Sequence, residues 1–311
     1  MSFELTILGC NSAIPTNHRK PTAQLLNVAE RFFLIDCGEG TQLQLRKYKI
    51  RMQNIQHIFI SHLHGDHYFG LIGFISTMHL LGREKELHIY CPAELKEIIY
   101  IQLSASKTEL RFPLFFHEFG FDEAELLMES NDLTVHTIPL SHTLPCCGFL
   151  FKEKPKPRRM RKEMIEKHQI PLEKVPTIKA GGDYTLENGQ VIPHLELTKG
   201  AQLSRSFAFC SDTCYHEAII PQIKGVDMLY HEATFLDELK ERAQQTKHST
   251  AKEAAIIAKK AQVGRLIIGH YSQRYFDLNP LLEEAQSVFT LTQLAIEGDK
   301  YGLKREYDSD S

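Results

Sequence analysis

The segment Ser61-His-Leu-His-Gly-Asp-His67 constrains this chain more than any other feature of its sequence. It follows the apolar run 57–60, a pattern typical of a buried strand that ends in a tight turn. Zinc binds imidazole and carboxylate groups at about 2.0–2.2 Å, whereas the same groups packed without a metal would each need hydrogen-bond partners. The segment therefore favours a metal site over a polar surface loop. The candidate ligands are His62, His64, Asp66 and His67.

Three more candidate ligands lie farther along the chain, each at the end of a strand-like run: His142, Asp212 and His270. Each alone is compatible with a solvated or capping residue. Together with the first loop they favour a second set of ligands, because one loop cannot close two metal sites. Asp212 is the only carboxylate of the three and is suited to bridging two metals. Cys210 and Cys214 flank it at a spacing wider than C-x₂-C, so we interpret them as small core residues.

Alternating strand and helix patterns predict the class of fold. Helices are expected at 68–81, from Pro92 onward, at 250–262 and from Asn279 onward, and the third has Thr250 and Glu253 in capping-box spacing. Strands followed by helices, twice over, predict two sheets packed together with helices outside. Since no repeat or linker separates parts of the chain, residues 1–311 are expected to form a single domain. Strands are expected at 4–9, 23–29, 31–36, 57–62, 133–142, 147–151, 206–212, 227–233 and 265–270.

The composition is that of an ordinary globular protein and sets limits on its environment. No stretch approaches the ~20 apolar residues of a membrane span, and the first residues do not resemble a secretory signal. The seven cysteines show no framework spacing, which indicates free thiols and a cytoplasmic location.

Positive charge is concentrated in one segment of a chain whose net charge is −3. Residues 152–168 hold eight Lys or Arg against three Glu, together with two prolines. This pattern predicts an excursion from the body that ends in a short helix. A charged run of this kind is either a solvated surface or a contact surface for nucleic-acid phosphates.

The candidate ligands follow one another as the loop H-x-H-x-D-H at 62–67 and then His142, Asp212 and His270. This order resembles the order of metal ligands in the metallo-β-lactamase superfamily. Within it, the chain resembles the ribonuclease Z family, which processes the 3′ end of tRNA. The segments His231-Glu-Ala-Thr234 and His248-Ser-Thr250 are the most discriminating, because other superfamily members generally lack that pair. The remaining matching motifs extend over nearly the whole chain: Leu8-Gly9 with Ile14-Pro15-Thr16, Asp36–Gln42, Ser211-Asp-Thr213 and His270–Tyr275.

This resemblance implies an α+β protein, a four-layer αββα sandwich with the metals at one edge of its sheets. It implies two zinc ions per chain, and Asp212 would bridge them. The first zinc would be held by His62, His64 and His142, the second by Asp66, His67 and His270. His248 would donate a proton to the leaving oxygen, Glu232 would orient His248, and Asp66 would also orient the hydroxide. The implied reaction removes the 3′ trailer from precursor tRNA, leaving a 3′-hydroxyl on the tRNA and a 5′-phosphate on the trailer.

The resemblance also implies partners. Residues 152–195 would form a protruding basic arm that grips tRNA, and the protein would be a homodimer without any contact with a membrane. Arg274 follows a candidate ligand and would contact an RNA phosphate, although a plain salt bridge or a capping role explains it equally well. Candidate tRNA contacts in the arm are Lys156, Arg158, Arg159 and Arg161.

Two other kinds of function remain compatible with part of the sequence. The first is another hydrolase of the superfamily, such as a thioesterase-like glyoxalase II, a cyclic-nucleotide phosphodiesterase or a lactamase. The segments 231–234 and 248–250 and the basic segment speak against these. The second is a non-catalytic zinc or RNA-binding module, which would be favoured if a ligand or the pair Glu232 and His248 were missing. None is missing.

Overall fold

The computed structural model describes residues 2–308, which divide into two compact units. Unit 1 consists of residues 2–129, 134–151 and 206–303. Unit 2 consists of residues 130–133, 152–205 and 304–308. Among the described residues, no helix is both long and apolar enough to cross a membrane.

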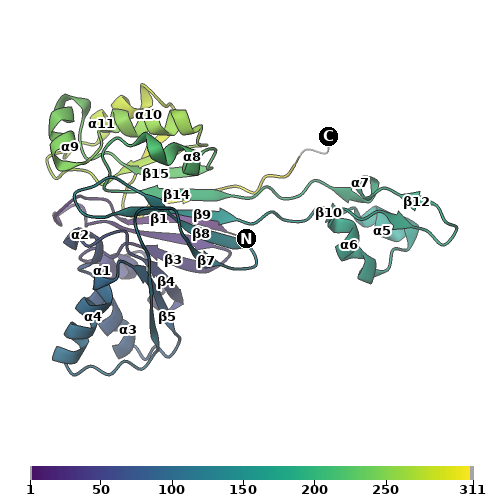
Figure 1. The fold of residues 1–311 in the computed structure, drawn as a ribbon, viewed down its shortest axis with the longest axis horizontal. Helices are drawn as coiled ribbons and strands as arrows, with labels where there is room; N and C mark the ends of the chain where they lie inside the picture. Colours follow the sequence, from purple (N-terminus) through teal and green to yellow (C-terminus); the bar gives the residue numbers. More distant parts are fainter. Residues whose placement is uncertain (1, 309–311) are drawn as a thin grey trace. The chain divides into compact units, whose positions relative to one another are not determined.

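The first sheet of unit 1 has seven strands in the order β18-β1-β2-β3-β4-β5-β6. Strands β3 to β6 run parallel, so their carboxyl ends meet at one edge. Helices α1 (Thr41–Lys47), α3 (Leu71–Leu80) and α4 (Glu94–Ala105) lie along this sheet (Figure 1). The strands are β1 (Phe3–Gly9), β2 (Ala23–Val28), β3 (Arg31–Ile35), β4 (Ile55–Phe59), β5 (Leu87–Cys91), β6 (Leu114–Glu118) and β18 (Lys300–Gly302).

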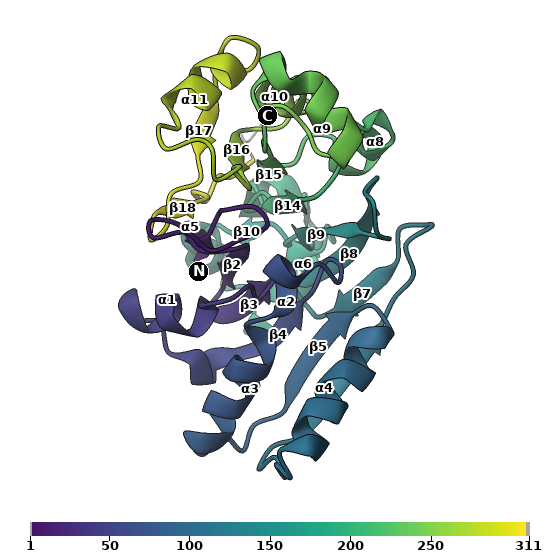
Figure 2. The same cartoon turned by 90° about the vertical axis from the view of Figure 1, so that its left-hand side faces the viewer.

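The second sheet has seven strands in the order β17-β16-β15-β14-β9-β8-β7, and β14 to β17 run parallel. Helices α8 (Ile220–Ile223), α9 (Lys240–Thr246), α10 (Ala251–Ala261) and α11 (Asn279–Gln286) lie on its side of the unit (Figure 2). Its strands are β7 (Leu126–Glu129), β8 (Leu133–Pro139), β9 (Cys147–Glu153), β14 (Ser206–Cys210), β15 (Met228–Glu232), β16 (Leu266–Gly269) and β17 (Thr292–Leu294).

Aromatic side chains pack between the two sheets. The ring of Phe59 lies 5.4 Å from that of Phe149 and 5.3 Å from that of Phe151, and Phe149 stacks on Phe209 at 6.4 Å. A second apolar core lies between the first sheet and its helices and includes Leu34, Ile58, Phe74 and Ile89. Two sheets with helices on both outer faces confirm the predicted four-layer architecture.

The helix expected at 68–81 is instead two helices. Helix α2 (Gly65–Tyr68) is followed by α3, which begins at Leu71. The break lies at Gly70, whose backbone N–H donates to the carbonyl of Cys37 at 2.9 Å. A Cβ on Gly70 would lie 2.2 Å from the carbonyl oxygen of Gly38, so only glycine allows this approach. The predicted capping box at the start of α10 is confirmed by both of its hydrogen bonds.

Unit 2 has a small core of its own, formed by Ile170, Ile178, Ile192 and Leu197. Glu153 and Arg205, both buried, pair through two hydrogen bonds of 2.8 and 3.0 Å at the ends of the segment 152–205. The short helix expected after the basic run is α5 (Lys162–His168). The other elements are β10 (Arg159–Met160), η2 (Leu172–Lys174), α6 (Val175–Lys179), β11 (Tyr184–Thr185), β12 (Val191–Ile192), α7 (His194–Leu197) and β13 (Thr198–Lys199).

Candidate metal centre

Three side chains of the metal centre lie just past the ends of strands of unit 1. Asp36 follows β3, Asp212 lies just after β14, and His270 follows β16 directly. These three residues have φ values of 55°, 59° and 58°, in the left-handed region that non-glycine residues rarely adopt. Such backbone strain costs about 1–3 kcal/mol per residue and is characteristic of functional sites. The fold thus holds these three side chains in directions that a regular strand could not give them.

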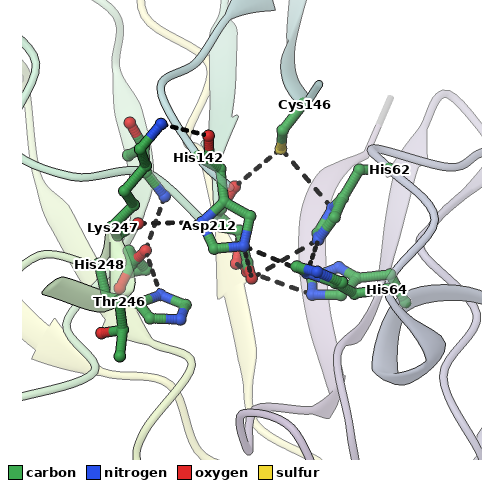
Figure 3. Close-up of polar contacts among 12 residues, drawn as sticks. His62, His64, His142, Cys146, Asp212, Thr246, Lys247 and His248 are labelled. Atoms are coloured by element: carbon green, nitrogen blue, oxygen red, sulfur yellow. Dashed lines mark hydrogen bonds and ion pairs between the residues drawn. The ribbon is translucent and has the colours of Figure 1, made fainter. Parts of the chain in front are cut away.

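The first ligand group brings together His62, His64, His142 and Asp212, as the sequence predicts (Figure 3). The Nδ1 atom of His64 lies 3.0 Å from Nε2 of His62 and 3.2 Å from Nε2 of His142. The Oδ2 atom of Asp212 lies 3.6 and 3.4 Å from those two Nε2 atoms. Donor atoms about 2.0–2.1 Å from a tetrahedral zinc would lie about 3.3 Å apart, so these distances fit one cation.

The second group brings together Asp66, His67 and His270, and Asp212 faces it with its other oxygen. The Oδ1 atom of Asp212 lies 3.2 Å from Nε2 of His67 and 3.0 Å from Nε2 of His270. The Oδ2 atom of Asp66 lies 3.5 Å from each of the same nitrogens. Both nitrogens are buried, and neither makes a hydrogen bond even though these carboxylate oxygens lie close to it. Buried polar atoms are rarely left unpaired, so a cation fits this group too.

The electrostatics of the centre favour a bound cation. Burial opposes a charge on His67, but the carboxylates of Asp212, Asp36 and Asp66 raise the pKa of its imidazole well above the usual value. Burial likewise opposes a charge on Asp212, yet His270 and His67 hold its pKa well below the usual range. Asp212 therefore stays ionised in a buried place, which requires positive charge beside it.

Asp36 is a buried carboxylate that contacts the ligand loop; it begins one of the matching motifs, but the sequence analysis assigned it no role at the metal centre. Its Oδ2 lies 2.7 Å from Nδ1 of His67, and its Oδ1 accepts from the backbone N–H of Ser61 at 2.8 Å. The hydroxyl of Ser61 donates to Oδ2 at 3.0 Å and lies 3.0 Å from Nδ1 of His62. One carboxylate thus orients His67 directly and His62 through Ser61, so it reaches both ligand groups.

His142 and His270, which follow strands of the second sheet, are also oriented by hydrogen-bond partners on their Nδ1 atoms. His142 Nδ1 donates to the carbonyl of Lys247 at 3.0 Å, and the Lys247 ammonium donates to the carbonyl of His142 at 3.0 Å (Figure 3). His270 Nδ1 lies 3.1 Å from the hydroxyl of Thr234. A partner on one ring nitrogen leaves the other facing the metal, which is the usual arrangement around metal-binding histidines. Thr234 lies within the motif 231–234, but nothing in the sequence indicated Lys247.

The structure places the predicted pair His248 and Glu232 beside the centre. Nδ1 of His248 lies 2.8 Å from Oε1 of Glu232, and its ring lies 5.0 Å from that of His142. Burial alone would lower the pKa of His248, but the Glu232 carboxylate raises it to about 9. Burial would raise the pKa of Glu232, yet the charge of His248 holds it below its usual value. The pair therefore keeps a proton on His248 at neutral pH.

A cavity of about 690 Å³ opens over the centre and is lined by residues of both ligand groups and by His248. Arg274 lies in its wall, as does Arg242. The Nε–H of Arg274 donates to the hydroxyl of Ser272 at 3.1 Å, and its guanidinium lies 5.1 Å from the ring centre of Phe235. Arg274 therefore has structural contacts while it still faces the cavity.

All seven cysteines are free, as predicted. Cys210 is fully buried, whereas Cys214 is only half-buried and does not belong to the core. Cys146 received no role from the sequence, but its Sγ lies 3.6 Å from Nδ1 of His62 (Figure 3).

The four basic residues predicted to contact tRNA lie in unit 2 and have partners there. The Nε–H of Arg158 donates to the hydroxyl of Thr198 at 2.8 Å, and the Nε–H of Arg161 donates to the backbone carbonyl of Thr198 at 2.8 Å. Arg159 donates to the carbonyl of Gly200 at 2.9 Å, and Lys156 lies 3.2 Å from a carboxylate oxygen of Glu153. These residues therefore contribute to the internal structure of unit 2.

The amino-acid sequence of this chain is similar to those of known proteins over nearly its whole length. A ribonuclease Z of Bacteroides thetaiotaomicron is 46% identical over 311 residues and covers 98% of both chains. A ribonuclease Z of Cytophaga hutchinsonii is 49% identical over 302 residues, covering 97% of this chain and 96% of its own. The family model of the anti-Pycsar protein Apyc1 matches residues 3–156.

Solved structures show the same fold. The short form of human tRNase Z superposes with a TM-score of 0.70 at 27% identity, covering 96% of this chain and 98% of its own. The metallo-β-lactamase fold protein YhfI of Bacillus subtilis superposes with a TM-score of 0.68 at 18% identity, covering 97% and 100% of the two chains.

Proposed function

This chain belongs to the ribonuclease Z family, and from that premise we propose that it removes the 3′ trailer from precursor tRNA. It is a metal-dependent hydrolytic endoribonuclease. One observation carries the proposal for this site: two ligand groups share Asp212, and the His248–Glu232 pair lies directly beside them. We further propose a cytoplasmic location, which the free cysteines favour.

The residues present fit two zinc ions. The first would be held by His62, His64 and His142 and the second by Asp66, His67 and His270, with Asp212 between them. Nitrogen and carboxylate donors in these numbers are typical of zinc sites. Two such cations would neutralise charge on a phosphodiester and lower the pKa of water.

The remaining chemistry is assigned to side chains of the chain itself. His248 would donate its proton to the leaving 3′-oxygen, because the Glu232 carboxylate keeps that proton in place at neutral pH. Asp66 would orient the attacking water in addition to its ligand role. It accepts a hydrogen bond of 2.7 Å from the backbone N–H of Ala13, which fixes its direction. The products would be a tRNA with a 3′-hydroxyl and a trailer with a 5′-phosphate.

Binding of tRNA is assigned to unit 2 and to the cavity wall. Residues 152–195 would form the arm that grips tRNA, and Arg274 would contact a phosphate near the cut. Since Arg158, Arg159 and Arg161 have internal partners, three exposed lysines of α5 and η2 are the better candidates for phosphate contacts: Lys162, Lys167 and Lys174. We further propose a homodimer, on the family resemblance alone.

The direct test is to incubate the purified protein with a 3′-extended tRNA transcript and to map the cut. One cut at the junction of tRNA and trailer, with a 3′-hydroxyl on the tRNA, is expected. Hydrolysis of bis-p-nitrophenyl phosphate without any cleavage of the transcript would overturn the proposal in favour of a small-molecule phosphodiesterase.

A further inference from the structure

Phe69 is an exposed aromatic side chain in the wall of the cavity above the metal centre. Its side chain is 62% exposed and lines the same cavity as His64, Asp66 and His248. The other phenylalanine of that wall, Phe235, is only 5% exposed. A single exposed aromatic residue on a surface needs no explanation, but one that faces a catalytic cavity presents a flat apolar surface to the substrate.

The ring of Phe69 is held close to the metal ligands. It packs against Gly65, where a Cβ would lie 2.2 Å from the ring atom Cε2. Gly65 lies between His64 and Asp66, so the ring lies against the backbone that joins a ligand of the first group to one of the second. The ring of Tyr68 contacts Phe69 edge-on at 5.0 Å. These two contacts restrict the ring, so Phe69 would lose less freedom than an unsupported side chain when a ligand stacks on it.

The surroundings of Phe69 indicate the kind of group that would cover it. Arg242 and Arg274 line the same cavity and supply positive charge for phosphates. Cations that follow a backbone, combined with an aromatic face on which a base stacks, form the usual surface for single-stranded nucleic acid. Unpaired bases of RNA ends are recognised in this way, because they are free to leave the helix stack.

We propose that Phe69 stacks on an unpaired nucleobase next to the phosphodiester that is cut. This inference rests on the proposed endoribonuclease function and adds a substrate contact to it. The contact would hold one of the two nucleotides that flank the cut, the last of the tRNA or the first of the trailer. Since every base has an aromatic face, the contact selects single-stranded RNA and tolerates any sequence.

The test combines variants of Phe69 with RNA that lacks one base. Rates are measured for Phe69→Ala, Phe69→Leu and Phe69→Tyr on a 3′-extended tRNA and on two versions with an abasic site, one on each side of the cut. Phe115→Ala is the matched control, because Phe115 is also an exposed phenylalanine but lies on β6, outside the cavity wall.

Stacking on an aromatic side chain is sequence-tolerant and sizeable, so kcat/KM for the intact substrate should fall roughly 5- to 150-fold in Phe69→Ala. Phe69→Leu should show much of this loss, Phe69→Tyr little, and Phe115→Ala none. On the RNA that lacks the stacked base, wild type and Phe69→Ala should be equal. Zinc content should be the same in every variant.

Three results would overturn the inference. Equal rates of wild type and Phe69→Ala on intact RNA would leave the ring without a role. An undiminished effect of Phe69→Ala on both abasic substrates would mean that no base contacts the ring. If wild type itself fails to cut any 3′-extended tRNA, the proposed function fails and the stacking contact with it, which is distinguishable from the first two results.

Discussion

Replacing His248 by Ala should separate proton donation from metal binding. Nδ1 of His248 lies 2.8 Å from Glu232. His248, Glu232, Asp212 and His270 also form a third group that could hold a metal, but His248 is not one of the seven proposed ligands, so the variant should keep its zinc. Glu232 would still accept hydrogen bonds from the backbone N–H groups of Thr213 and Ser249 and from the hydroxyl of Thr234, at 2.7, 3.1 and 2.5 Å. The buried carboxylate therefore stays satisfied, and the fold should be preserved.

The expected loss for His248→Ala follows from the leaving group. A ribose oxygen needs a proton as it leaves, so cleavage of precursor tRNA should slow by roughly 10²–10⁴-fold, the usual contribution of a general acid. Bis-p-nitrophenyl phosphate releases p-nitrophenolate without protonation, so its hydrolysis should change far less. The assay is kcat on both substrates, with zinc content measured on the same preparation. Loss of zinc, or equal losses on both substrates, would refute the assignment of His248 as proton donor.

Three further perturbations test other parts of the structure. Glu232→Gln removes the negative charge beside His248 and should lower its pKa, which is about 9 in the wild type. The protonated form of His248 is then lost at a lower pH, so cleavage should fall most at alkaline pH. A pH–rate profile like that of wild type would contradict the role of Glu232. Asp36→Asn should weaken zinc binding by roughly 10–100-fold in a chelator competition, with a smaller effect for Ser61→Ala, and unchanged affinity would exclude the orienting role. Replacing the exposed lysines Lys162, Lys167 and Lys174 of unit 2 by Gln should weaken precursor-tRNA binding and make its salt dependence shallower, while bis-p-nitrophenyl phosphate hydrolysis stays constant. Undiminished tRNA binding would mean that these charges are only solvated surface.

The candidate ligands could be predicted because their signals are local. His62, His64, Asp66 and His67 lie within one loop, and Asp212 and His270 each lie at the end of an apolar run that reads as a strand. Parallel strands bring such ends to the same edge of a sheet, so residue type and position were sufficient.

The residues that orient the ligands could not be predicted, because their contacts depend on the pairing of distant segments. Asp36 meets Ser61 only because β3 and β4 run side by side in parallel, 25 residues apart. The pairing of β10 with β13 likewise places Thr198 beside Arg158, 40 residues away. A charge count records these arginines as free positive charge, whereas the structure uses them inside unit 2.

We propose that two metals, joined by Asp212, are both needed for cleavage. The most direct measurement removes the metal with a chelator, returns zinc in known equivalents and follows cleavage of a 3′-extended tRNA. Activity should remain low at one equivalent per chain and reach its full value at about two, since the seven proposed ligands form two groups joined by Asp212. Full activity at one equivalent, with no second zinc bound, would contradict the proposed two-metal site.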